Sequence, residues 1–193
     1  MKALNHFVVR VKKPFVDTLE LGEETIYLDS KWNEFENRIC YGEIVSPPTR
    51  HNTGAKRGDT LFFHHHVTTT DNLKIYDNMY VASYGGWKPH AIAYRRKKDG
   101  EIVMLGNWIF VEPAEVDKTD RVTDSGIVVE LGINVKDRDV AKVLVPTEYM
   151  REQGVSAGDI VGFTADADYK MVLDDGSIVY RMTEDNVLYV EEK

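Results

Sequence analysis

The sequence predicts a mostly β protein built from two small β-barrels in tandem. Short runs of alternating or β-branched apolar residues are separated by Gly, Pro, Asn and Asp, which is the pattern of small all-β domains. The two halves repeat one order of elements, and Gly58-Asp59 and Gly158-Asp159 lie 100 residues apart in them. We therefore expect one barrel at 1–104 and a second at 105–193.

The stretch 99–112, DGEIVMLGNWIFVE, links the two halves. Its first part, a turn at Asp99-Gly100 followed by apolar residues, matches the end of the chain from Asp175-Gly176 onward. Its second part, residues 105–112, matches the opening strand at 4–11. A stretch that closes one unit and opens the next indicates a tandem repeat.

The elements of the first half follow from turn residues and period-two alternation. A strand at 4–11 ends before Pro14, and 15–37 form a long loop or weak hairpin with one apolar island, Thr25 to Leu28. Strands follow at 38–46 and 60–67.

Residues 68–98 have no later counterpart and predict an inserted hairpin, with strands at 79–84 and 91–95. Its aromatic tip, Tyr84 to Pro89, either forms an exposed contact or folds back over the first barrel.

The second half repeats this order. Strands are expected at 105–112, 139–145 and 160–164, and a polar loop at 113–138 carries the island Gly126 to Val129. Thr147 can cap a short helix over 148–153, ended by Gly154. This is the one helix that the sequence predicts.

Composition argues against several classes of protein. The net charge of −8 disfavours binding to nucleic acid, because phosphate contacts need a basic surface. The basic run at 95–98 is expected to be a solvated turn. Cys40 is the one cysteine, so no internal disulfide forms, and we expect it to be buried. No apolar run approaches the roughly 20 residues of a membrane span, and no signal peptide is visible, so we expect a cytoplasmic protein without membrane association.

His64-His65-His66 raises the question of a metal site. On a strand, His64 and His66 would face one side, with His51 or His90 as a third ligand. No Cys or acidic partner lies at metal spacing, and the repeat has Thr164-Ala165-Asp166 at the corresponding place. We expect a polar strand end there, with no metal and no cofactor.

The chain also lacks the motifs of common enzymes. The aspartates at 166, 168, 174 and 175 lie in turn-like sequence, and no phosphate-binding loop or nucleophile motif is present. We therefore expect no enzymatic activity.

The second half resembles the co-chaperonin GroES family over about 90 residues. The resemblance rests on the opening strand 107–112, a loop with Ser125-Gly126-Ile127-Val128-Val129, the turn 157–161 and the closing segment IVYRMTEDNVLYVEE. The first half matches more loosely, through Tyr41-Gly42-Glu43-Ile44-Val45 and Arg57-Gly58-Asp59. Its island lacks the glycine, and neither half has the family's roof hairpin.

This resemblance implies a tandem co-chaperonin that caps a GroEL-like chaperonin ring and assists ATP-dependent folding of an unfolded client inside the cavity. The expected chaperonin-binding residues are Gly126, Ile127, Val128 and Val129, with Ile26, Tyr27 and Leu28 in the first loop. It also implies a ring-shaped homo-oligomer, and a bacterial or bacteriophage origin since no transit peptide is visible. The alternative is a non-enzymatic structural or assembly protein, such as a virion component, built on the same barrels.

Overall fold

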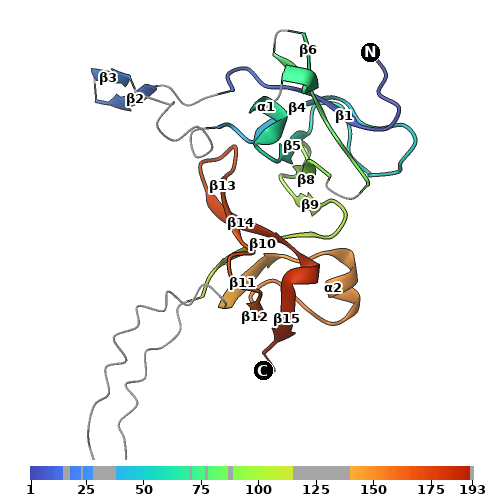
Figure 1. Ribbon diagram of the computed structural model, residues 1–193, viewed down its shortest axis with the longest axis vertical. Coiled ribbons are helices and arrows are strands. Elements are labelled where there is room, and N and C mark those ends of the chain that lie inside the picture. The colour runs from blue at the N-terminus through green and yellow to red at the C-terminus, as the bar shows by residue number, and fades with distance from the viewer. Residues whose placement is uncertain are drawn as a thin grey trace, which may run out of the picture. The chain divides into compact units, whose positions relative to one another are not determined.

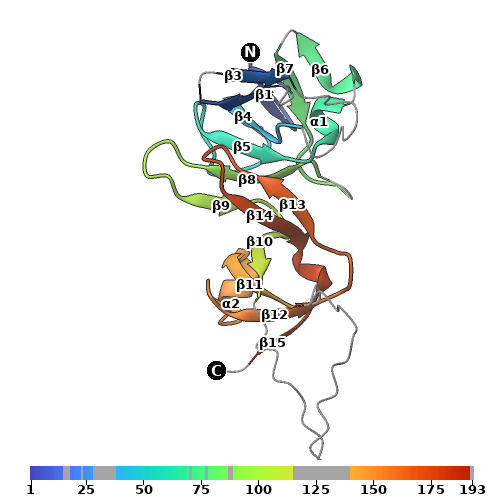
Figure 2. The same cartoon turned by 90° about the vertical axis from the view of Figure 1, so that its left-hand side faces the viewer.

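The computed structural model describes residues 1–14, 18–22, 24–27, 38–69, 71–76, 78–86, 89–114 and 140–191. The described chain is mostly β, as predicted, and its sheets are antiparallel (Figures 1 and 2). None of the helices described is long and apolar enough to cross a membrane. The chain forms two compact units, 1–108 with 170–179 and 109–169 with 180–193, and each has its own apolar core.

The first unit contains a seven-stranded sheet in the order β6-β7-β1-β4-β5-β8-β9. The strands are β1 (Phe7–Arg10), β4 (Tyr41–Ser46), β5 (Thr60–Phe63), β6 (Lys74–Tyr76), β7 (Met79–Ala82), β8 (Ala91–Arg95) and β9 (Ile102–Met104). A short helix, α1 (His66–Thr69), and a 3-10 turn, η1 (Asp71–Leu73), follow β5. A separate hairpin of β2 (Thr18–Leu21) and β3 (Glu24–Tyr27) lies between β1 and β4 in the chain.

The second sheet has six strands in the order β13-β14-β10-β11-β12-β15. They are β10 (Trp108–Pro113), β11 (Val140–Val145), β12 (Ile160–Phe163), β13 (Tyr169–Val172), β14 (Ile178–Thr183) and β15 (Val187–Val190). Helix α2 (Glu148–Glu152) and the 3-10 turn η2 (Glu184–Asn186) connect them. In the residues described, both strand orders run from one edge strand to another, and neither sheet closes into a barrel.

The two sheets share one topology. Taken in chain order, β1, β4, β5, β6, β7 and β8 hold the same places as β10, β11, β12, β13, β14 and β15, and β9 is an added edge strand. The pairing register agrees in detail: a bulge separates Val8 from Val9 opposite β4, and another separates Phe110 from Val111 opposite β11. The tandem repeat is therefore present in the backbone as well as in the sequence.

The Gly-Asp turns form the same element in both units. The Ile44 N–H donates to the Asp59 carbonyl and Gly58 N–H to the Ile44 carbonyl, and Val143 repeats both bonds with Asp159 and Gly158. Each aspartate side chain accepts a backbone N–H three residues earlier, from Lys56 at 2.7 Å in one unit and from Ser156 at 2.9 Å in the other. Both glycines have positive φ, 92° and 96°, which explains their residue type.

The predicted inserted hairpin is wrong. The two strands at its place do not pair with each other, since β7 pairs with β1 and β6 while β8 pairs with β5 and β9. By strand order they correspond to β14 and β15, so 74–95 belong to the repeat. For the same reason the end of the chain does not match 99–104, because β14 is the counterpart of β7 and not of β9.

In the linking stretch, β9 is an edge strand of the first sheet and β10 is the first strand, in chain order, of the second sheet. Gly106, with φ of 61°, lies in the turn between them. Helix α2 is also confirmed: the Thr147 hydroxyl accepts the Met150 N–H at 3.0 Å, and Gly154 follows with φ of 87°. Cys40 is buried, as expected.

Candidate functional site

The predicted chaperonin-binding residues are divided between described and undescribed parts of the chain. Gly126, Ile127, Val128, Val129 and Leu28 lie outside the described residues. Ile26 and Tyr27 are described and lie on β3. The segments 11–40 and 114–139 join the first two strands of each repeat, β1 to β4 and β10 to β11, so both predicted loops occupy the same topological position.

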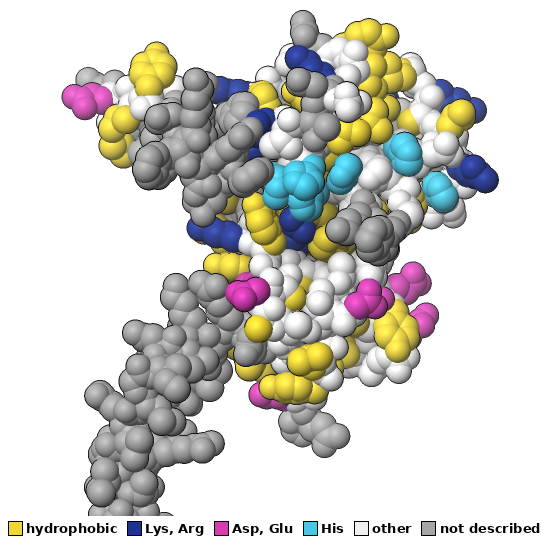
Figure 3. Space-filling view, in the orientation of Figure 1, with side chains coloured by type: hydrophobic (Ala, Val, Ile, Leu, Met, Phe, Trp, Pro, Cys, Tyr) yellow, Lys and Arg dark blue, Asp and Glu magenta, His cyan; other side chains and the backbone are white. Residues whose placement is uncertain are grey.

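The β2–β3 hairpin presents apolar side chains to solvent. Its register pairs Thr18 with Tyr27 and Leu21 with Glu24. Leu21 is 55% exposed, Ile26 42% and Tyr27 83%, and every residue of β3 is exposed (Figure 3, upper left). An isolated two-stranded sheet is marginal in water, and this one buries no β3 side chain. The hairpin therefore offers an apolar surface that suits a binding partner.

A second apolar surface lies on the edge strand of the second unit. On β15, Leu188 is 67% exposed, Tyr189 51% and Val190 37%. A groove of about 530 Å³ runs between this strand and α2, where Tyr149 is 59% exposed. Among the strands that the structure describes, β15 has a neighbour on one side only, so both its backbone edge and its apolar side chains are available for pairing.

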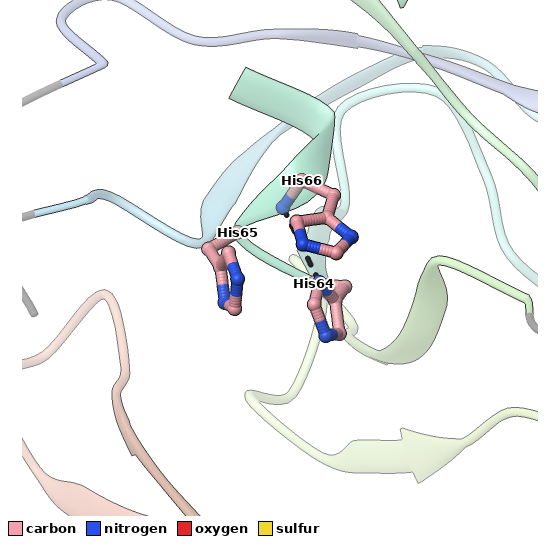
Figure 4. A group of neighbouring side chains, drawn as sticks. All are labelled: His64, His65 and His66. Carbon is pink, nitrogen blue, oxygen red and sulfur yellow. Dashed lines mark hydrogen bonds between the residues drawn. The ribbon is translucent and has the colours of Figure 1, made fainter. Parts of the chain in front are cut away.

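The histidine run lies at the end of β5, and the predicted strand 60–67 stops early. The strand ends at Phe63, and the chain turns through His64 and His65 into α1 (Figure 4). Consecutive side chains alternate on a strand, whereas this turn brings all three rings together. Their centroids lie 4.1, 4.3 and 4.5 Å apart, and their ligand nitrogens fall within 4.8 Å of one another.

His90 adds a fourth imidazole to this group. It immediately precedes β8, and the His64 N–H donates to its carbonyl at 2.9 Å. Its ring lies 6.3 Å from that of His64 and 6.5 Å from that of His66. Within the part of the chain that the structure describes, its Nδ1 is buried without a hydrogen-bond partner. Burial, and then the neighbouring His66 and His6, lower the pKa of His90, which favours the neutral imidazole.

The remaining two histidines have different surroundings. The Nδ1 of His6 accepts the Tyr84 N–H at 3.3 Å, and the ring of His51 packs edge-on against Tyr84 at 5.2 Å. His51, a ligand considered from sequence, is thus not in the convergent group. Tyr84 also packs on Phe7 at 5.8 Å, so this residue of the predicted aromatic tip folds back on the first unit, while Trp87 is outside the described residues.

The aspartates at 174 and 175 lie in a hairpin turn, as the sequence predicts. Asp175 accepts the hydroxyl and the backbone N–H of Ser177 and pairs with Arg95 at 2.8 Å. These contacts, the Ser177 hydroxyl first, hold the pKa of the Asp175 carboxyl well below its usual range. Arg95 also pairs with Asp174, at 3.2 Å. Both carboxylates are therefore engaged in ion pairs with Arg95, and that of Asp175 is also engaged in contacts of the turn.

Comparison with protein-family models, with curated proteins and with solved structures finds no match. The two repeats share one backbone topology, so residues that differ between equivalent positions are not required by that backbone.

Proposed function

We propose that this protein is a tandem GroES-like co-chaperonin, and that each of the two sheets with its connections is one GroES-like domain. It caps a chaperonin ring in the cytoplasm and assists the folding of a client protein inside the cavity. The observation that carries the proposal is the solvent-exposed β2–β3 hairpin, which joins the first two strands of its repeat. The segment with Gly126 to Val129 holds the same topological position in the second repeat.

The mechanism needs no catalytic group in this chain. Burial of Tyr27 or Ile127 in an apolar groove contributes roughly 1.5–3 kcal/mol per side chain. Ordering a loop costs about 1–2 kcal/mol for each backbone position that becomes fixed. One loop therefore binds weakly, and several loops on one oligomer bind tightly through their effective concentration. Weak individual contacts also permit release when the chaperonin, which hydrolyses the ATP, changes conformation.

A ring of subunits is part of this proposal, and β15 supports it. Edge strands with exposed apolar side chains are sites of association between chains. Leu188, Tyr189 and Tyr149 form such a surface in the second unit. Assembly through this edge would present the loops of several chains together.

The same surfaces favour one alternative, a structural or assembly protein whose hairpin and β15 edge hold neighbouring subunits. Limited proteolysis separates the two functions. For a co-chaperonin, the segment 116–136 is cut in the free protein and is protected when a chaperonin ring and nucleotide are added. For an assembly protein, cleavage in this segment is the same with and without the chaperonin, which would contradict the proposed function.

A further inference from the structure

The histidine group in the first unit has the composition of a transition-metal site. His64 and His65, in the turn after β5, converge with His66, the first residue of α1 (Figure 4). His90, the residue before β8, lies beside them, with its ring 6.3 Å from that of His64. Imidazole is the nitrogen ligand that Zn²⁺, Co²⁺, Ni²⁺ and Cu²⁺ bind in proteins. Among the described residues, the ligand group is the three consecutive imidazoles, with His90 beside it and no carboxylate in it, so it lacks the oxygen ligands that Ca²⁺ or Mg²⁺ requires.

The second unit shows that the fold does not require these histidines. The bond from the His64 N–H to the His90 carbonyl is repeated by Thr164 and Asn186, also at 2.9 Å. The bond from the Val67 N–H to the His64 carbonyl is repeated by Ala167 and Thr164. The same backbone bridge thus carries histidine on both sides in one unit and threonine and asparagine in the other.

The spacing of the rings suits a tetrahedral ion after small side-chain rotations. With Zn–N bonds of 2.0–2.1 Å, the ligand nitrogens lie roughly 3.4 Å apart and the ring centroids roughly 5 Å apart. The present centroid separations, 4.1–4.5 Å within the run and 6.3–6.5 Å to His90, lie on either side of that value. Binding therefore draws His90 toward the run and spreads the three consecutive rings.

One existing hydrogen bond has to be exchanged. The His64 Nδ1 accepts the His66 N–H at 3.3 Å, which places the ring proton of neutral His64 on Nε2. Coordination through Nε2 moves that proton to Nδ1, and coordination through Nδ1 displaces the donor directly. Either way this bond is lost, and it is a long bond in an exposed position.

We propose that His64, His65, His66 and His90 form a binding site for a divalent transition-metal ion, with Zn²⁺ as the reference ion. The ion joins the turn after β5 to the residue that precedes β8, so its role is to fix the two chain segments that flank these adjacent strands. The site is independent of the proposed loop contact with a chaperonin. Either can fail without the other.

The test is a titration of the full, chelator-treated chain with Zn²⁺ by calorimetry, and with Co²⁺ by visible absorption. We expect one ion per chain, an intense tetrahedral Co²⁺ spectrum and a Zn²⁺-dependent rise in Tm. The variant His64→Thr/His90→Asn introduces the side chains of the second repeat on the same backbone bridge. It should lose at least 100-fold in affinity together with the Tm rise.

Two further variants complete the test. His66→Ala removes an exposed side chain that the fold does not need and should weaken Zn²⁺ binding at least 10-fold, whereas the matched control His51→Ala should bind as the wild type does. Absence of stoichiometric binding by the wild type would overturn the proposal. Unchanged affinity in both His64→Thr/His90→Asn and His66→Ala would also overturn it.

Discussion

At the scale of single residues, equivalent cross-strand pairs in the two repeats contain similar kinds of side chain, but on opposite strands of the pair. Arg10 on β1 faces Glu43 on β4, and the equivalent pair is Glu112 with Lys142, with the charges reversed. Phe62 faces Ala93 across β5 and β8, and at the equivalent place Gly162 faces Tyr189. In the first case both units keep one positive and one negative side chain. In the second case both units keep one aromatic and one small residue, on exchanged strands.

The pair Gly162 and Tyr189 yields a double-mutant prediction. A Cβ built on Gly162 would lie 2.1 Å from the tyrosine ring, so Gly162→Ala forces that ring off the strand. We expect a loss of about 1 kcal/mol in the free energy of unfolding. In a Tyr189→Ala background the same change should instead stabilise, by about 0.5 kcal/mol, because alanine is less flexible than glycine in the unfolded chain.

Chemical denaturation of the wild type, the two single variants and the double variant gives the four free energies of unfolding that this prediction compares. Equal effects of Gly162→Ala in the two backgrounds would show that the ring does not cover the glycine. Ala141→Gly, on the neighbouring strand β11, serves as a control for glycine in this sheet.

Asp175 yields a prediction on pH. Its native pKa is depressed, so it contributes stability that is present above the unfolded pKa of about 3.9 and is lost as the pH falls through and below that value. The side chain is 45% exposed, and its effect on stability is correspondingly small. NMR titration of its carboxyl should show a pKa below the usual range in the wild type.

The same titration ranks the causes of the shift. Ser177→Ala should raise the pKa of Asp175 more than Arg95→Gln does, because the serine hydroxyl, at 2.6 Å, is the largest contributor. A larger rise in Arg95→Gln would show that the ion pair dominates instead.

At the scale of elements, local sequence signals predict most of the strands, turns and caps that form. They predict little about which strands pair with each other. The Gly-Asp turns, the cap at Thr147 and the alternating strands 41–46 and 140–145 follow from residue type and period. The positions of β7 and β8 in the sheet do not follow from residue type and period, because a local pattern does not specify a strand's partner. Helix α1 was missed because His66-Val67-Thr68-Thr69 consists of weak helix formers, which tertiary contacts fix in this conformation.

The Gly-Asp turn is the element to test by substitution. Asp59 is 6% exposed, and its two oxygens accept the N–H groups of Lys56 and Lys97 at 2.7 and 3.0 Å. Asp59→Ala leaves these donors without their acceptor, and we expect a loss of about 1–3 kcal/mol in unfolding free energy. Asp99→Ala is the control, because Asp99 is exposed and accepts one bond within its own turn. Equal denaturation midpoints for the two variants would contradict this role of Asp59.

At the scale of the whole molecule, the candidate function depends on surfaces that the two cores do not use. The sequence alone predicted an apolar island at 25–28, and the structure places Ile26 and Tyr27 on an exposed hairpin. It left His51 and His90 as equal candidates for a further histidine beside this run, because only the pairing of β5 with β8 brings His90 to the group. Non-local strand pairing is thus the reason why the sequence did not specify either the partners of β7 and β8 or the position of His90.

The β15 edge carries a prediction about assembly. If subunits associate through it, Leu188→Glu places a charge in an apolar contact and should shift the protein to a smaller species in sedimentation velocity. Ile178→Glu changes another exposed apolar side chain and should leave the oligomer intact. The same sedimentation coefficient for wild type and Leu188→Glu would contradict assembly through this strand.

The most direct test of the proposed function is co-sedimentation with the chaperonin ring of the source organism, with and without nucleotide. We expect the wild type to sediment with the ring only when nucleotide is present. Ile127→Asp should abolish this, and Ile26→Asp/Tyr27→Asp should weaken it, because a charge cannot enter an apolar groove without a partner. Leu4→Asp, at another exposed apolar residue, should bind as the wild type does. If the wild type does not bind the ring in either condition, the co-chaperonin function is contradicted and the tandem repeat remains as a structural finding.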